Sequence, residues 1–119
     1  MDSFRLQILR APLMREDLVA IAAGGFGDMV KAVVDIERGA MAIGADLAAD
    51  EEAALMDDGS RQRDLWGINL YPSDATEAWI EFDSMINVRP AQSNRSRGVD
   101  NEMTRSAIIR TIESLVRDA

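Results

Sequence analysis

Apolar and polar positions alternate over residues 79–89, and a period of two is typical of a strand with one buried face. One set of alternating positions is Ile80, Phe82, Ser84, Ile86 and Val88, and the other is Trp79, Glu81, Asp83, Met85, Asn87 and Arg89. Pro90 follows, and because proline cannot donate to a sheet ladder it ends the strand or marks an edge. The pattern therefore predicts a long strand that leads into an Asn/Ser/Arg-rich loop.

Three other regions show strand patterns. Residues 4–8 predict a short edge strand, and residues 65–71 alternate Trp66, Ile68 and Leu70 with Gly67, Asn69 and Tyr71. Val30, Ala32, Val34 and Ile36 alternate with Lys31, Val33, Asp35 and Glu37. Arg38 and Gly39 then offer a tight turn into residues 40–44, which indicates a hairpin.

Three helices are expected between these strands. Pro12 suits a first helical turn, Leu18 and Ile21 share one face, and Gly24 and Gly25 can take the left-handed geometry that ends a helix. A short helix is predicted over residues 50–57, with acids in its first turn and Gly59 beyond its end. The last helix has Asp100 as its expected N-cap. Its apolar stripe contains Ile108, Ile109, Ile112, Leu115 and Val116.

Together these elements predict a single α+β domain over residues 1–119, in the order β-α-β-β-α-β-β-α. Antiparallel strands with one polar face, and helices with one apolar stripe, imply a mostly antiparallel sheet of four to five strands covered on one face by helices. A ferredoxin-like β-α-β-β-α-β core with an added strand and helix is the alternative topology.

The absence of cysteine and histidine narrows the possible chemistry. It removes disulfides, zinc sites and Ser-His-Asp catalysis, so any catalysis would use carboxylates, Lys31, Tyr71 or a hard cation. We expect no cofactor and no dedicated metal site, although Asp35, Glu37, Glu81 and Asp83 would be the oxygen ligands if a cation bound.

The formal net charge of −8 makes binding to nucleic acid or to an anionic membrane surface unexpected. The sequence has no apolar run long enough to cross a bilayer, and its start, MDSFRLQILR, lacks the apolar core of a signal peptide. We therefore expect a cytoplasmic protein.

The polar sides of the predicted strands form one surface if the two hairpins are adjacent. That surface would contain Lys31, Asp35, Glu37, Asn69, Glu81, Asp83, Asn87 and Arg89. One interpretation is a solvated outer face with cross-strand ion pairs. Another is a homodimer interface through Val33, Trp79 and Met85, since aromatic residues and methionine are enriched at interfaces. A third is an active site, with Lys31, Glu81, Asp83 and Arg89 as catalytic candidates.

The loop after the long strand is the candidate ligand-binding site, formed by Asn87, Asn94, Arg95, Ser96 and Arg97. Guanidinium groups before a helix can bind an anion. Asp100 argues against this, because its carboxylate would already satisfy the helix N–H groups. The alternative is a structural loop in which Asn and Ser bond the backbone and the arginines pair with acids.

Four segments resemble a family of small, mainly bacterial proteins catalogued as domain of unknown function 5674. They are GDMVKAVVDIERG at residues 27–39, AIGADLAADEEA at 42–53, DLWGINLYP at 64–72 and IEFDSMINVRPAQSNRSRGV at 80–99. The resemblance implies no activity, cofactor or catalytic residue, but it covers the segments that the patterns indicate.

Two functional hypotheses follow. The first is a small oligomeric, non-enzymatic module that binds a partner or a small anionic ligand through the polar sheet face and the loop; it is favoured because no convincing catalytic constellation is present. The second is a carboxylate-based hydrolase or lyase that acts on an anionic small molecule. A concave site that contains Lys31, Asp83 and Arg97 would favour the enzyme.

Overall fold

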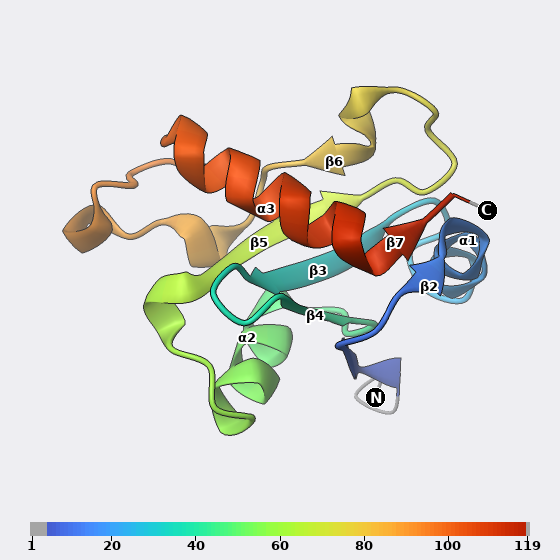
Figure 1. Cartoon of the computed structure of the whole chain (residues 1–119), viewed down its shortest axis with the longest axis horizontal. Helices are drawn as coiled ribbons and strands as arrows, with labels where there is room; N and C mark the ends of the chain where they lie inside the picture. Colours follow the sequence, from blue (N-terminus) through green and yellow to red (C-terminus); the bar gives the residue numbers. More distant parts are fainter. Residues whose placement is uncertain (1–4, 119) are drawn as a thin grey trace.

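The computed structural model describes residues 5–118, in which five antiparallel strands form the central sheet in the order β1-β4-β3-β5-β6 (Figure 1). The strands are β1 (Gln7–Leu9), β3 (Val30–Asp35), β4 (Ala40–Ile43), β5 (Leu65–Leu70) and β6 (Ile80–Glu81). Two further short strands, β2 (Leu13–Met14) and β7 (Val116–Arg117), pair in parallel. The predicted opening strand is therefore confirmed as an edge strand, although Phe4 lies outside the described residues.

The helices are α1 (Arg15–Ala23), α2 (Ala48–Asp57) and α3 (Glu102–Leu115). Single 3-10 turns lie at η2 (Gln62–Asp64), η3 (Glu77–Trp79), η4 (Met85–Asn87) and η5 (Pro90–Gln92). The predicted α+β class and antiparallel sheet are confirmed. The sequence does not predict β2 and β7, because strands of two residues carry no periodic signal.

The β3–β4 hairpin forms where the alternating pattern predicts it. Gly39 takes a φ of 68°, which a residue with a side chain rarely adopts. Asp35 stabilises the turn, since its Oδ1 accepts hydrogen bonds from the backbone N–H groups of Glu37 and Arg38, each at 2.9 Å. The buried Asp35 is thus part of the hairpin rather than of a polar surface.

Helices cover both faces of the sheet, which corrects the predicted one-sided cover. On one face Val30, Ala32 and Val34 pack with α1 and α3. On the other face Val33, Ala40, Ala42 and Leu65 pack with Leu55 of α2. β3 is buried on both sides because its second face carries Val33 between its polar residues, and the alanines of β4 leave room for a helix. Figure 1 shows α3 and α2 on opposite sides of the sheet.

The prediction of a long strand over residues 79–89 is wrong. β6 contains only Ile80 and Glu81, after which the chain leaves the ladder and forms η4 and η5. Ser84 instead donates its backbone N–H to the carbonyl of Arg97 at 2.9 Å, so that this segment pairs with the loop that follows it. An alternating pattern cannot distinguish these turns from a strand, because the side chains of the turns are also sorted into buried and exposed sets.

Two helix ends differ from the prediction. Asn101, not Asp100, caps α3: its Oδ1 accepts from the N–H groups of Met103 at 2.8 Å and Thr104 at 3.1 Å. At the end of α1, Gly24 is right-handed with a φ of −82°, and the positive φ of 105° occurs at Gly27. No helix within residues 5–118 has the length and hydropathy required to span a bilayer.

Candidate functional site

Helix α2 divides the polar face that the sequence predicts. Its C-terminal end lies beside Asp35, because Ser60 Oγ donates to Asp35 Oδ2 at 2.6 Å. Its first turn lies beside Ala45, whose N–H donates to Glu51 Oε2 at 3.1 Å. Lys31, which lies at the opposite end of β3 from Asp35, is therefore on the part of the face that α2 leaves accessible.

Lys31, Asn69 and Glu81 are in register across three strands, since Lys31 pairs with Asn69 and Asn69 pairs with Glu81. The Asn69 amide donates to Glu81 Oε1 at 2.9 Å, and Tyr71 Oη donates to the same oxygen at 3.2 Å. Burial and the neighbouring Glu81 carboxylate raise the pKa of Tyr71, so its hydroxyl remains a donor at neutral pH.

Asp83 and Arg97 extend this arrangement toward the Asn/Ser/Arg loop. The backbone carbonyl of Asp83 accepts from the Asn69 amide at 3.1 Å, and its carboxylate pairs with Arg97 Nε at 2.5 Å. We call this surface the open polar row: Lys31, Asn69, Tyr71, Glu81, Asp83 and Arg97. The strand register thus places Lys31 and Glu81 on one face of the sheet, on either side of Asn69.

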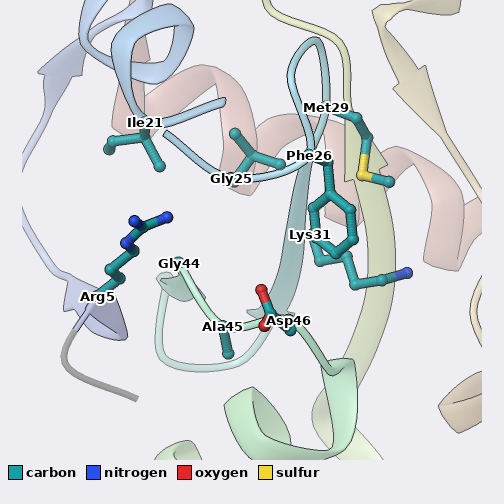
Figure 2. Close-up of a pocket in the computed structure, with 10 residues that line it drawn as sticks. Arg5, Ile21, Gly25, Phe26, Met29, Lys31, Gly44, Ala45 and Asp46 are labelled. Carbon is teal, nitrogen blue, oxygen red and sulfur yellow. The ribbon is translucent and has the colours of Figure 1, made fainter. Parts of the chain in front are cut away.

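The side chain of Lys31 is half-buried, and its Nζ lies 5.7 Å from the centroid of the Phe26 ring. In Figure 2 the aliphatic chain of Lys31 passes the ring and its ammonium group points away from Arg5. The adjoining cavity has a volume of about 20 Å³, and Ala45 and Asp46 also line it. That volume holds about one water molecule. Lys31 makes no ion pair with the residues that the structure describes.

Glu51 is the buried ionisable residue that the sequence did not indicate as special. Its side chain is 0% exposed, and burial raises its pKa from 4.5 to about 9, against the hydrogen bond from Ala45 and the charge of Lys31. Its Oε1 has no hydrogen-bond partner among residues 5–118. The carboxyl group is therefore protonated at neutral pH. One sequence signal was present: Glu51 lies four residues before Leu55, on the face of α2 that packs against the sheet.

Arg89, a catalytic candidate, stabilises the fold instead. Its Nε donates to the carbonyl of Ile86 at 2.9 Å and its Nη1 to that of Gln62 at 3.0 Å, while its Nη2 donates to the carbonyl of Leu65. The guanidinium lies 4.8 Å from the centroid of the Trp66 ring, and burial lowers its pKa. These hydrogen bonds commit its donors to three backbone carbonyls.

The Asn/Ser/Arg loop is bonded mainly to itself. Asn94 donates to the carbonyls of Asn87 and Gly98, each at 2.8 Å, and its Oδ1 accepts from the N–H of Asp100 at 2.8 Å. Ser96 Oγ donates to Asp100 Oδ1 at 2.7 Å. Asp100 thus stabilises the loop rather than the helix, which explains why Asn101 is the cap.

Only part of the predicted ligand-binding set is accessible. Asn87 and Asn94 are buried, whereas Arg95, Ser96 and Arg97 are exposed. Arg97 is paired with Asp83, and the guanidinium of Arg95 makes no hydrogen bond or ion pair with the described residues. A ligand at this loop would therefore contact the two arginines and not the asparagines.

The three predicted interface residues do not share a surface. Val33 is completely buried beneath α2, whereas Met85 is 65% exposed. Trp79 packs against the core cluster on the opposite face of the sheet, because it belongs to the turn η3 and does not continue the alternation of β6.

The described residues include no group of three or more His, Cys, Asp or Glu side chains placed to hold a metal ion. The carboxylates of Asp35 and Glu81 are separated by the sheet positions that α2 covers. The cavity beside Lys31 is lined by neither Glu81 nor Asp83, so these catalytic candidates do not converge there.

No curated protein and no solved structure matches this chain. A family model matches residues 7–115, which includes every strand of the central sheet, all three helices and the whole open polar row. The chain belongs to the family described as protein of unknown function (DUF5674).

Proposed function

We propose that this protein is a non-enzymatic binding module that holds a small ligand with an anionic group at the open polar row. The observation that carries the proposal is Lys31. It is the only lysine in the chain, it lies at the accessible end of the sheet face, and it makes no ion pair with a described carboxylate. An unpaired ammonium group beside fixed hydrogen-bonding side chains is suited to an anionic group.

The neighbours of Lys31 define the ligand further. Glu81 accepts from Asn69 and Tyr71 through Oε1 and retains acceptor capacity for another donor. Adjacent strands lie about 4.8 Å apart, so the backbones of Lys31 and Glu81 are about 10 Å apart across two spacings. A ligand that reaches both residues would carry an anionic group for Lys31 and a donor, such as an ammonium group, for Glu81.

Binding is a better interpretation than catalysis for two reasons. Arg89 is committed to backbone carbonyls, and the small cavity beside Lys31 does not contain the other catalytic candidates. A hydrolase or lyase requires its base and its electrostatic stabiliser within reach of one reacting atom. The homodimer stays a prediction. Sedimentation equilibrium, which measures the mass of the protein in solution, tests it directly.

Calorimetry and thermal unfolding test the proposal with inorganic phosphate, monocarboxylates and amino acids as probes. We expect at least one anionic or zwitterionic probe to raise the Tm of the wild-type protein, since a ligand that binds only the native state stabilises it. The shift should disappear in Lys31→Met and persist in Arg105→Met, an exposed site on α3 across the sheet. Equal shifts in both variants, or no shift with any probe, would contradict it.

A further inference from the structure

A groove of about 350 Å³ lies between α3 and the β6 edge, on the face of the sheet opposite to the open polar row. Its lining residues are Glu77, Trp79, Ile80, Phe82, Ile109 and Glu113. Figure 1 shows α3 and β6 as neighbouring elements on this side of the molecule. We call it the α3–β6 groove.

The floor of the α3–β6 groove is apolar. Trp79, Ile80 and Phe82 pack against the main core with their inner surfaces, and each remains only half-buried, as does Ile109 on α3. Arg15 lies over one face of the Trp79 ring, and no described helix or strand covers the outer surfaces of the other three side chains. Adjacent half-exposed aromatic and aliphatic side chains are typical of interaction sites, because leaving them in water forgoes the free energy of burial.

Trp79 is held in place before any partner arrives. The guanidinium of Arg15 lies 3.9 Å from the centroid of the indole ring. Arg15 is itself fixed, since its Nε donates to the carbonyl of Pro72 at 3.0 Å, and the carbonyl of Trp79 accepts from the N–H of Tyr71 at 2.7 Å. A tryptophan fixed in this way loses little conformational entropy when a partner packs against it.

Two acidic residues flank this apolar floor. Neither the carboxylate of Glu77 nor that of Glu113 makes a hydrogen bond or an ion pair with the described residues. Asp58 and Asp83, by contrast, pair with Arg38 and Arg97. Two copies of this groove packed face to face would bring like charges together, which disfavours a second copy of the chain as the occupant.

We propose that the α3–β6 groove binds a short segment of another protein in which basic residues flank apolar side chains. The apolar residues would lie over Trp79 and Ile109, and the basic residues would pair with Glu77 and Glu113. This site is separate from the open polar row, so neither proposal depends on the other.

The test is fluorescence anisotropy with a short fluorescein-labelled peptide of alternating arginine and leucine. A peptide of the same length with glutamate in place of arginine is the charge-reversed control. We expect saturable binding of the basic peptide alone, weakened by about tenfold or more in the double variant Glu77→Gln, Glu113→Gln. The matched control Glu16→Gln, Glu102→Gln removes two exposed charges outside the groove and should retain most of the affinity.

A second variant separates the apolar contribution from general attraction to an acidic protein. Ile109→Ser removes apolar area from the groove floor at a partly exposed position and should also weaken binding, while circular dichroism confirms that the fold is retained. Equal binding of both peptides, or equal affinities in the two double variants, would overturn the proposal. A homodimer that dissociates in Ile109→Ser would also overturn it, because the occupant would then be a second copy.

Discussion

The side-chain amide of Asn87 forms with the backbone of Gly67 the two hydrogen bonds that a neighbouring strand would form. Asn87 Oδ1 accepts from the N–H of Gly67 at 2.8 Å, and Nδ2 donates to its carbonyl at 2.9 Å. Gly67 lies on β5 two residues before Asn69, the position at which β6 ends its pairing. The amide therefore satisfies the edge of β5 where no strand continues.

Replacing this amide should destabilise the protein strongly. Asn87→Ala removes both bonds to Gly67 and a third to the carbonyl of Arg97 at 3.0 Å, and it leaves buried backbone groups without partners. Since such groups cost about 1–3 kcal/mol each, we expect a loss of roughly 2–4 kcal/mol in the free energy of unfolding, measured with urea. Gln92→Ala, which removes an exposed amide, is the control and should cost far less. Similar losses in the two variants would contradict this role.

The close approach of Ser84 to Gly67 of β5 leads to a second prediction. A Cβ added at Gly67 would lie 2.5 Å from Ser84 Oγ and 2.6 Å from its Cβ, so Gly67→Ala should destabilise the protein by about 1–3 kcal/mol. Ser84→Gly, made in the same chain, removes both clashing atoms and should recover part of that loss. Urea unfolding of the two single variants and the double variant gives the coupling energy. Additive effects would show that the clash is not the cause.

These contacts explain which parts of the fold the sequence predicts. The β3–β4 hairpin and the stripe of α3 are recoverable, because side-chain periodicity and the turn residues follow directly from local geometry. The strand over residues 79–89 is not, because the Asn87 side chain takes the place of a strand backbone in bonding Gly67, which lies 20 positions earlier in the chain. Asparagine competes with regular structure in this way, and a local pattern carries no information on distant backbone groups.

The sequence predicts the candidate site only in part, as it does the fold. Alternation places Lys31 and Glu81 on the same side of the sheet, and the structure does so as well. It cannot show that α2 packs over Val33, since that depends on how the helix crosses the sheet. Glu51 is missed because an acid in a first helical turn is ordinarily exposed and favoured by the helix dipole.

Arg89, which the sequence suggested as a catalytic residue, should instead stabilise the fold through its hydrogen bonds to backbone carbonyls. Lysine keeps the charge but cannot reach the carbonyls of Ile86, Gln62 and Leu65 together, because it lacks the planar fork of the guanidinium. We expect Arg89→Lys to lower the free energy of unfolding by about 2 kcal/mol in urea titrations. Arg63→Lys, at an exposed site in η2, serves as the control and should change it little. An unchanged free energy of unfolding in Arg89→Lys would show that these hydrogen bonds do not stabilise the fold.

The buried carboxyl of Glu51 should make the stability of the protein fall as the pH rises. In the unfolded chain the group ionises near pH 4.5, whereas in the folded protein it stays protonated up to about pH 9. Between these values the folded state binds the extra proton, so the free energy of unfolding decreases with increasing pH. Glu51→Gln is neutral at every pH and keeps an oxygen that can accept from Ala45. It should therefore unfold with a flatter pH profile and exceed the wild type in stability by about 3 kcal/mol at pH 7.

Urea titrations at pH 5, 7 and 9 separate this effect from a simple packing change. The gain from Glu51→Gln should be small at pH 5, which is only half a unit above the unfolded-state pKa of 4.5, and should grow toward pH 9. Asp57→Asn, an exposed carboxylate on the same helix, controls for the loss of one negative charge and should shift the whole profile by little. A gain that is equal at all three pH values would mean that the carboxyl is ionised in the folded protein, with Lys31 or a buried water as its partner.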